Sequence, residues 1–346
     1  MDGEAMGATA RTGSVPAPTA HRYAATMARS GDVESHGGVE FSNLDQPLFE
    51  GAGATKRDLV EYLDRVRERI LLELRDRPLS VIRVTRGQAP FMQKNLPKYT
   101  PEWVARASIW AEASQRIVDY ALCNDRRTLL WFANQRAIEY HPTLTRVDRP
   151  DRVTHLVLDL DPPPDAPFSR AVAAAHLVRQ ALDDVGLAGA VKTSGAKGVH
   201  VIVPIDTAST MADAAAATRA IARRAEALDP RTATTAFLKA DRKGKVFVDS
   251  TRAGGATVVA AYSPRARPGV PVSFPVAWDD LDEVSPADFT ILNALGPLGD
   301  RDPWAAALPA AQHVPDDLVA EGHKIPVARV AAMHEGKRRK ARARKR

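Results

Sequence analysis

The chain has 346 residues, of which 45% are hydrophobic and 26% charged, a composition typical of a globular protein with a sizeable core. Its single cysteine, Cys123, excludes an intramolecular disulfide and a cysteine-rich zinc site. No apolar run is long enough to span a bilayer and no secretory signal is visible, so we expect a cytoplasmic protein without a membrane partner.

The first part of the chain combines an irregular leader with short alternating elements. Residues 1–38 are rich in small and polar side chains without periodicity, which predicts a disordered leader. Apolar residues then recur at helical spacing from Leu59 to Ile70, and Thr55 is a suitable N-cap for this predicted helix. We expect a strand over 79–87 next, followed by short elements up to His141.

Strands and helices alternate more regularly in the second part of the chain. We predict a strand at "THLVLDLD", a helix from Ser169 to Gly186, two strands joined by a tight turn over 190–205, a helix over 211–228 and a strand at "KGKVFVDS". This order is typical of an α+β sheet with helices packed on one face. Such a sheet can hold the "DLD" strand and the "FVD" strand side by side.

The strand at "THLVLDLD" contains two carboxylates in an otherwise apolar run. Because alternate residues of a strand share a face, Val157, Asp159 and Asp161 point to one side, with the two carboxylates about 7 Å apart. Such a pair resists burial unless a cation lies beside it; the alternative is a strand end frayed into solvent. Asp249 ends a second apolar strand in the same way. Three carboxylates from neighbouring strands would suit two Mg²⁺ or Mn²⁺ ions, the arrangement used in nucleotidyl and phosphoryl transfer.

The "SGAKG" turn adds groups that suit a triphosphate. Gly195 and Gly198 allow the backbone to approach an anion closely, and the amides between them can form a concave nest. Ser194 and Lys197 add a hydroxyl and a cation, and His200 follows on the next strand. The alternative is an ordinary hairpin. Beside three carboxylates, the nucleotide interpretation is favoured because a triphosphate needs both metal ions and amide donors.

The C-terminal residues 337–346 hold eight Lys or Arg and no acidic residue, so the rest of the chain is slightly acidic. One interpretation is a solvated tail. The other is a disordered basic arm that contacts phosphates without reading sequence, and deleting such an arm should flatten the salt dependence of DNA binding.

Four segments, "HLVLDLDPPP", "KTSGAKGVHVIVP", "RKGKVFVD" and "AYSPRAR", occur in an order and spacing that resemble the polymerase domain of bacterial ligase D. "FMQKNLPKYTPEW" and "WFANQRAIEYHP" are similar to upstream segments of that domain, so the resemblance spans roughly Phe41 to Leu298. It implies the archaeo-eukaryotic primase-like α+β core, with antiparallel and mixed sheets and packed helices, here as a stand-alone version without a ligase domain. The expected organisation is a primase-polymerase domain over 39–300, with an N-terminal part over 39–150 and a catalytic, metal-binding part over 151–300, then a C-terminal extension over 301–346.

The resemblance implies a template-directed nucleotidyltransferase that fills short gaps or extends DNA ends in repair, uses ribonucleotides readily and needs two Mn²⁺ or Mg²⁺ ions. The implied partners are gapped or broken DNA, nucleoside triphosphates, an end-binding protein and a ligase, and the implied location is the nucleoid within the cytoplasm. The positions that match the family's catalytic metal ligands are Asp159, Asp161 and Asp249. Those that match its nucleotide contacts are His141, Ser194, Lys197, His200, Arg242 and Arg265. Those that match its template and DNA-end surface are Lys56, Phe91, Lys94 and Lys98.

Structural alternatives exist for two of these residues. A histidine before a proline, as at His141, often has a purely structural role, and Phe91 could lie in the core with the neighbouring lysines merely solvated. The chain also departs from the family at two positions. Gln46 stands where the family has a lysine that contacts a downstream 5′-phosphate. Arg252 stands where the family has an amide near the triphosphate, which bears on nucleotide selectivity.

Three other functions share some of these features. A haloacid-dehalogenase-type phosphatase also begins with a strand ending in Asp-x-Asp, but Pro163 stands where that family has Thr or Val. A metal-dependent nuclease uses similar carboxylates but would not need the "SGAKG" hairpin. A non-catalytic module that binds DNA ends would not need the acids at all. Primer extension with labelled nucleotide separates all three from a polymerase.

Overall fold

The structure is a computed structural model that describes residues 34–111, 115–254 and 256–327. Most of the predicted leader, and the basic segment 337–346, lie outside the described residues. The folded part begins before the expected boundary at residue 39, because strand β1 (Glu34–His36) pairs antiparallel with β2 (Val39–Phe41). The Phe41 side chain at the end of this hairpin is fully buried and anchors it to the core.

Two helices replace the single long helix expected after Thr55. Thr55 caps α1 (Lys56–Arg65) as predicted, since its hydroxyl accepts from the Asp58 amide and the Asp58 carboxylate accepts from the Thr55 amide. The backbone leaves the helical conformation at Val66, and α2 (Arg67–Leu74) begins directly after it. The break allows both helices to turn apolar side chains into one core.

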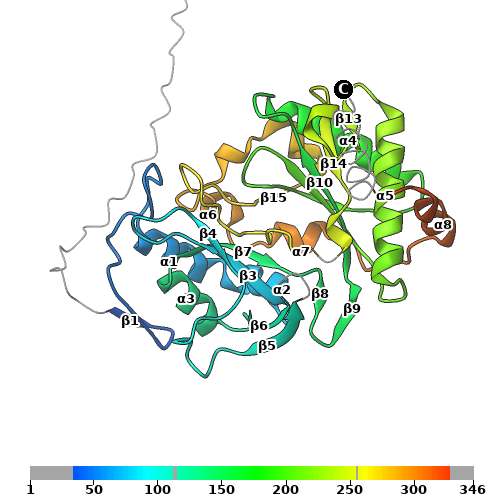
Figure 1. The fold of residues 1–346 in the computed structure, drawn as a ribbon. Coiled ribbons are helices and arrows are strands. Elements are labelled where there is room, and N and C mark those ends of the chain that lie inside the picture. The colour runs from blue at the N-terminus through cyan, green and yellow to red at the C-terminus, as the bar shows by residue number, and fades with distance from the viewer. Residues whose placement is uncertain (1–33, 112–114, 255, 328–346) are drawn as a thin grey trace, which may run out of the picture. The chain divides into compact units, whose positions relative to one another are not determined.

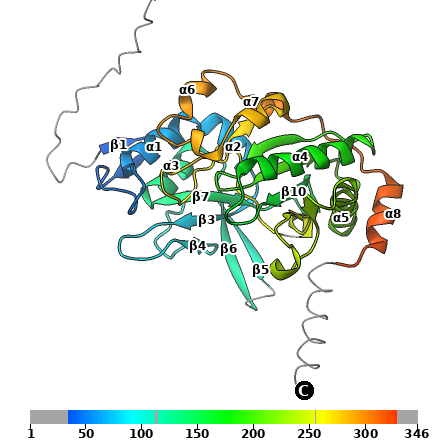
Figure 2. The ribbon, with the colours of Figure 1, turned by 90° about the horizontal axis from the view of Figure 1, so that it is seen from above.

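A five-stranded antiparallel sheet forms the N-terminal part, with β3 at its centre. Its strands are β3 (Pro78–Arg83), β4 (Phe91–Gln93), β5 (Arg106–Ala111), β6 (Arg116–Leu122) and β7 (Ala137–Pro142). Helix α3 (Arg126–Asn134) lies beside α1, and the β5–β6 ribbon extends away from these helices (Figures 1 and 2). A small sheet of β8 (Thr145–Arg146) and β9 (Arg149–Val153) leads into the second part.

The second part is built on a six-stranded mixed sheet, in which all neighbours are antiparallel except β13 and β14. In spatial order its strands are β13 (Ala233–Thr234), β14 (Val246–Asp249), β10 (His155–Asp161), β12 (Val199–Pro204), β11 (Ala190–Thr193) and β15 (Pro275–Val276). The predicted pairing of the "DLD" and "FVD" strands is therefore confirmed, and so is the α+β class.

Helices α4 (Phe168–Asp183) and α5 (Met211–Leu228) pack against each other and against one face of this sheet (Figure 1). Both helices bury several alanines, whose small side chains allow close approach to the strands. Ser169 does not cap α4 as expected, because Pro167 occupies the N-cap position and Ser169 lies inside the first turn. Gly186 follows the helix end with a positive φ of 69°, as predicted for a stop signal.

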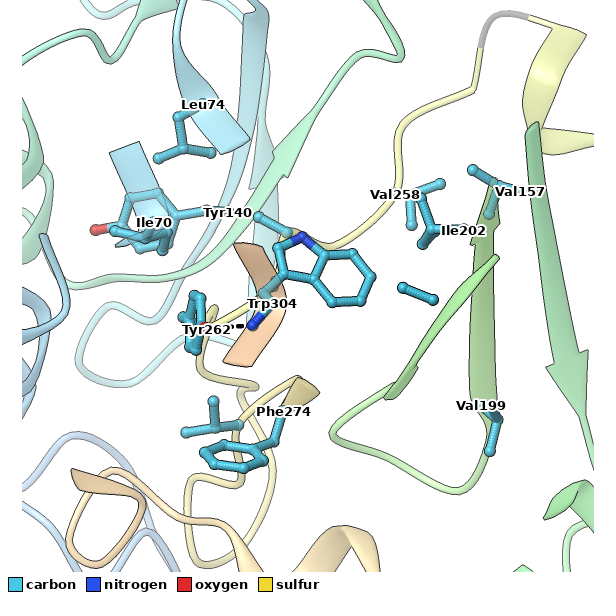
Figure 3. Packing of buried hydrophobic residues seen from close by; sticks show 14 of the residues in the cluster. Ile70, Leu74, Tyr140, Val157, Val199, Ile202, Val258, Tyr262, Phe274 and Trp304 are labelled. Carbon is cyan, nitrogen blue, oxygen red and sulfur yellow. Dashed lines mark hydrogen bonds between the residues drawn. The ribbon is translucent and has the colours of Figure 1, made fainter. Parts of the chain in front are cut away.

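The other face of the six-stranded sheet packs towards the N-terminal part. Val157 and Ile202 line a small cavity together with Glu73 of α2, so this is the face that also carries Asp159. Trp304, on the short helix α7 (Pro303–Ala307), lies between Ile70 on one side and Val157 on the other (Figure 3). The face that carries Asp159 therefore lies towards the N-terminal part of the fold.

The C-terminal residues up to 327 are part of the same fold rather than a separate extension. Helix α8 (Asp316–Lys324) packs on α5, and a Cβ atom at Gly322 would lie 1.9 Å from the carbonyl oxygen of Ala216. The remaining short elements are α6 (Leu295–Leu298) and the 3₁₀ helices η1 (Lys239–Asp241), η2 (Arg252–Gly254), η3 (Trp278–Glu283) and η4 (Pro286–Asp288). Among the helices in the described part of the chain, none combines the length and apolar character needed to cross a bilayer.

Candidate active site

A row of four charged or titratable side chains crosses the six-stranded sheet. Asp159 on β10 lies directly opposite Asp249 on β14 and His200 on β12, and His200 lies opposite Lys192 on β11. Directly opposite residues of antiparallel strands share a face, so all four side chains point to the same side. All four are nearly buried, with exposed fractions between 1% and 8%.

Hydrogen bonds connect three members of this row, Lys192, His200 and Asp159. The Lys192 ammonium donates to Nδ1 of His200 at 2.8 Å and to the Ser273 hydroxyl at 2.6 Å. Nε2 of His200 lies 3.3 Å from Oδ1 of Asp159. Burial, reinforced by Arg265, lowers the pKa of Lys192 to about 7, and burial together with Lys192 lowers the pKa of His200 to about 4. A neutral His200 therefore accepts from Lys192 and donates to Asp159.

Arg252 lies at the other end of the row, between two carboxylates. One of its terminal nitrogens, Nη2, is 2.8 Å from Oδ2 of Asp159 and 3.4 Å from Oδ2 of Asp249. The second oxygen of Asp249, Oδ1, accepts from the amide and the hydroxyl of Thr251 at 2.8 and 2.7 Å. Burial alone would raise the pKa of Asp159, but His200 and Arg252 hold it well below its usual range. Asp159 is therefore ionised at neutral pH.

Asp161 is the third carboxylate and lies two residues further along β10, on the same face. Unlike the other two it is exposed to solvent. Partial desolvation and the charges of Asp159 and Asp249 raise its pKa to about 6. The upward shift means that the three carboxylates are close enough to repel one another, which is the electrostatic situation that a bound cation relieves.

The donor set fits divalent cations. Three carboxylates supply the hard oxygen ligands that Mg²⁺ and Mn²⁺ prefer, and the Arg252 guanidinium already marks a place for positive charge between Asp159 and Asp249. Across residues 34–327, the undescribed positions aside, no three His, Cys, Asp or Glu side chains converge closely enough to form a ready metal centre. At this site Arg252 pairs with two of the carboxylates.

Two of the predicted nucleotide contacts, His141 and Arg265, meet at Glu139. Nε2 of His141 and Nε of Arg265 lie 2.8 and 3.0 Å from Oε2 of Glu139, and Oε1 accepts from the Ala266 amide at 2.9 Å. Burial would raise the pKa of Glu139, but His141 and Arg265 outweigh it and lower the pKa. Arg265 also donates to the Ser194 carbonyl oxygen, so this cluster is joined to the "SGAKG" turn.

The "SGAKG" turn is closed by its own residues. The Ser194 hydroxyl accepts from the amides of Ala196 and Gly198 at 3.2 and 3.1 Å, and Lys197 is exposed and donates to the Pro164 carbonyl oxygen. Gly198 is required by packing, since a Cβ atom there would lie 2.2 Å from the Leu160 carbonyl oxygen. Gly198 thus allows the turn to approach β10 closely, and Gly195 allows it to approach Ser273, since a Cβ atom at Gly195 would lie 2.9 Å from the Ser273 backbone nitrogen.

Arg242 is a further cation near the carboxylates, and it lies next to Phe247 of β14. Its guanidinium stacks 3.8 Å from the ring centre of Phe247, which is directly opposite Asp161 across β14 and β10. Its Nε and Nη2 donate to the backbone oxygens of residues 236 and 237 at 3.3 and 3.2 Å. The structure therefore gathers the three predicted metal ligands and the six predicted nucleotide contacts around one end of the six-stranded sheet.

Of the four residues predicted to form the DNA surface, three are exposed and one, Lys56, is buried. Phe91 on β4 is 38% exposed, with Arg83 over its ring at 5.8 Å, and Lys94 and Lys98 are exposed nearby in the chain. Phe91 is thus not a core residue. Lys56, in contrast, is only 4% exposed, because its ammonium donates to the Ser42 carbonyl oxygen and to Asn134, both at 2.6 Å. Lys56 is a structural cation here and does not lie on the surface; burial and Arg136 lower its pKa to about 8.

Sequence reasoning missed three residues of the site, namely Glu139, Lys192 and Ser273. Glu139 stands in the apolar run "AIEYHP" two residues before His141, so the alternation rule places both side chains on one face. Lys192 stands in the buried strand "AVKT". A charged residue inside an apolar strand was a usable signal in both cases. Ser273 had no comparable signal.

Comparison with known proteins defines the class first. The chain is similar to the solved structure of the "Polymerase Domain from Mycobacterium tuberculosis Ligase D in complex with DNA", with a TM-score of 0.70 and 30% sequence identity over 82% of this chain and 98% of that one. The fold is therefore that of the archaeo-eukaryotic primases, as expected.

The family follows from the sequence comparisons. Residues 55–304 match the family described as "LigD, primase-polymerase domain". The chain is 33% identical over 274 residues to the bifunctional non-homologous end joining protein LigD of Bacillus subtilis, and 32% identical over 305 residues to the multifunctional LigD of Pseudomonas aeruginosa. These matches cover 78% and 85% of this chain but 43% and 36% of those relatives. The chain belongs to the LigD primase-polymerase domain family.

Proposed function

We propose that the protein is a template-directed nucleotidyltransferase that fills short gaps or extends DNA ends during repair by end joining. The observation that carries this proposal is the group of three carboxylates at one end of the sheet, two of them directly opposite on neighbouring strands, with basic groups on both sides. Nucleotidyl transfer needs oxygen ligands for metal ions beside cations that bind a triphosphate, and both stand together here.

Asp159, Asp161 and Asp249 would hold two Mg²⁺ or Mn²⁺ ions. When bound, such ions lower the pKa of the attacking hydroxyl and stabilise the charge on the triphosphate. The protein's own contribution is to hold the carboxylates in register through β-sheet pairing. His200 donates a hydrogen bond to Asp159. Because burial and Lys192 keep His200 neutral, it adds no positive charge that would repel a metal ion bound to Asp159.

The incoming nucleoside triphosphate would bind between His141 and Arg265 on one side and Arg242 on the other, with Lys197 near its phosphates. Glu139 orients the first two, because a single buried carboxylate contacts both of them. This is an electrostatic clamp in which charged groups are fixed before the substrate arrives, so little reorganisation is needed during the reaction.

The exposed patch of Phe91, Lys94 and Lys98 would contact unpaired template, since an exposed aromatic ring with neighbouring cations suits base stacking and phosphate contact. The similar Mycobacterium tuberculosis domain is described in complex with DNA, and the relatives are named as end-joining proteins. By analogy we propose DNA ends and gaps as substrates, a nucleoid-associated location, an end-binding protein and a ligase as partners, and ready use of ribonucleotides.

The test is a primer-extension assay on gapped, overhanging and unprimed templates, with Mn²⁺ or Mg²⁺ and with ribo- and deoxynucleotides compared at equal concentration. The wild-type protein should extend a templated gap only with a divalent ion, and Asp159→Asn should not. Ribonucleotides should be used at least as well as deoxynucleotides. DNA cleavage without incorporation would replace the proposal with a nuclease, and DNA binding without either reaction would replace it with an end-binding module.

A further inference from the structure

Arg252 is a cation of the candidate active site that contacts two of the three proposed metal ligands directly. Its Nη2 lies within 2.8 Å of Asp159 and 3.4 Å of Asp249, so it takes the position between the two carboxylates. An arginine guanidinium stays protonated in proteins, so Arg252 brings a full positive charge to this position. An uncharged amide at this position would leave the carboxylates facing each other without a cation.

Arg252 contacts the oxygens of Asp159 and Asp249 that do not face His200 or Thr251. Oδ1 of Asp159 faces His200, and Oδ1 of Asp249 accepts two hydrogen bonds from Thr251. The remaining oxygen of each carboxylate, Oδ2, faces Arg252. A metal ion bound between the two carboxylates would compete with the guanidinium for these oxygens.

Arg252 is placed so that it can be displaced. It stands at the start of the short 3₁₀ helix η2, whose next residue, Ala253, is fully buried and anchors the backbone. The Arg252 side chain is 32% exposed, and within the described structure its Nε makes no hydrogen bond. Only the tip of the side chain is fixed, by the two carboxylates, so the guanidinium can move while the backbone stays in place.

We propose that Arg252 is a resident counter-cation that occupies the metal site in the absence of substrate and couples metal binding to nucleotide binding. This inference rests on the proposed nucleotidyltransferase function. Displacing Arg252 by divalent ions alone leaves an unpaired guanidinium beside new positive charge, which is unfavourable. A nucleoside triphosphate supplies phosphate oxygens that accept the displaced guanidinium, so metal ions and nucleotide bind more tightly together than either does alone. By linkage, each raises the affinity for the other by the same factor.

The first experiment measures Mn²⁺ binding to nucleotide-free protein by electron paramagnetic resonance of the free ion. The variants are Arg252→Gln, which keeps the length but removes the charge, and Arg252→Lys, which keeps the charge. Arg231→Gln is the matched control, since Arg231 is 92% exposed and contacts Asp229 rather than the site. Charge-assisted contacts of this kind predict Mn²⁺ affinity at least roughly tenfold higher in Arg252→Gln than in wild type. Arg252→Lys and Arg231→Gln should remain close to wild type.

Thermal unfolding of the same proteins controls for misfolding. Metal-free Arg252→Gln should unfold at a lower temperature than wild type, because its three carboxylates lack their cation, and it should gain more from added Mn²⁺. The second experiment repeats the Mn²⁺ titration with an unreactive triphosphate analogue, after subtracting the Mn²⁺ that the analogue binds by itself. The analogue should raise the Mn²⁺ affinity of wild type by a larger factor than that of Arg252→Gln.

The outcomes separate this inference from the proposed function. If wild type and Arg252→Gln bind Mn²⁺ equally well, or Arg252→Gln binds it more weakly, the counter-cation role is wrong while the metal site stands. If the analogue raises the Mn²⁺ affinity of both proteins by the same factor, Arg252 does not couple metal binding to nucleotide binding. If neither protein binds Mn²⁺ with or without the analogue, the metal site itself, and with it the proposed function, is wrong.

Discussion

The two sheets of this protein differ in what they bury: one buries charged side chains, whereas the other exposes an aromatic side chain. The six-stranded sheet buries a row of charged groups on one face, where Asp159 is 8% exposed and is contacted by His200 and Arg252. The five-stranded sheet carries an aromatic residue, Phe91, on its outer strand β4, where it is 38% exposed. Fixed charges act most strongly where water is excluded, whereas a surface that binds a flexible strand has to remain open.

The difference assigns separate tasks to the two regions. The charged row is rigid because every group in it is held by a strand and by a partner side chain, which suits chemistry. The β4 surface is fixed by its backbone pairing with β3, and it leaves Phe91 and Met92 exposed to solvent. Substitutions in one region should therefore affect catalysis and those in the other should affect binding.

The largest expected effect is on catalysis, at Asp161. Loss of a metal ligand removes several kcal/mol of transition-state stabilisation, so Asp161→Ala should lower the rate of incorporation by at least about a thousandfold. DNA affinity and thermal stability should stay near wild type, because Asp161 is exposed and is repelled by its neighbours. Single-turnover extension and DNA binding are measured side by side, with the exposed Asp165→Ala as control. Near-normal extension by Asp161→Ala would exclude its role as a metal ligand.

A second prediction concerns recognition of a 5′-phosphate by the N-terminal part. Gln46 lines a cavity of about 760 Å³ together with Arg86 and Arg136. A lysine at position 46 would add a charge-assisted contact worth about 1.5–3 kcal/mol to a phosphate bound there. Gln46→Lys should therefore tighten binding to gaps with a downstream 5′-phosphate, but not to unphosphorylated gaps. Gln88→Lys, which adds the same charge to the same cavity, is the control, and equal tightening by both variants would mean general attraction instead.

A third prediction tests the open aromatic surface. Stacking of a base on Phe91 predicts that Phe91→Ala weakens binding to single-stranded template by about 1–3 kcal/mol, while nucleotide binding at the carboxylates is unchanged. Phe91→Trp should preserve the affinity. Fluorescence anisotropy with a labelled template measures both. Leu228→Ala, which removes a similarly exposed apolar side chain from the end of α5 on the other sheet, should have no effect. A similar loss of affinity in both alanine variants would show that template binding does not depend on base stacking on Phe91.

The smallest expected effect is on the free energy of unfolding at acidic pH, and it concerns the buried His155. Burial, with Arg77 and Arg146, lowers the pKa of His155 to about 3 from its ordinary value of 6.5. Native His155 is thus neutral, whereas the unfolded chain takes up a proton below pH 6.5, so the free energy of unfolding falls as the pH falls from 6.5 towards 3. The charged groups that line the same cavity are Glu73, Arg77 and Lys192.

His155→Asn should remove about 1–2 kcal/mol of the loss in unfolding free energy between pH 6.5 and 5. Urea unfolding at several pH values measures this slope, and the residual slope in the variant reports the other buried groups. The exposed His313→Asn is the control and should leave the slope unchanged. A slope identical in wild type and His155→Asn would show that His155 does not titrate on unfolding over this range.

Local patterns were sufficient to predict much of this protein. The alternation in "HLVLDLD" requires Asp159 and Asp161 to share a face, because a strand turns successive side chains to opposite sides. Thr55 with Asp58 specifies a helix start through hydrogen bonds that span three residues. The motifs of the family were sufficient to identify the primase fold. The strand alternation and the helix start depend only on neighbours in the chain.

Contacts between distant residues were decided only by the tertiary structure. Arg252 reaches Asp159 across 93 positions of sequence, and Lys56 reaches Asn134 across 78, so neither pairing is visible in any local pattern. Lys56 has the sequence context of a surface cation, yet the packing of α1 on α3 buries it and provides its oxygen partners. The sequence determined which faces carry charge. The pairing of strands and packing of helices determined which charges meet, because burial forces each ionised group to find a partner from whichever segment lies against it.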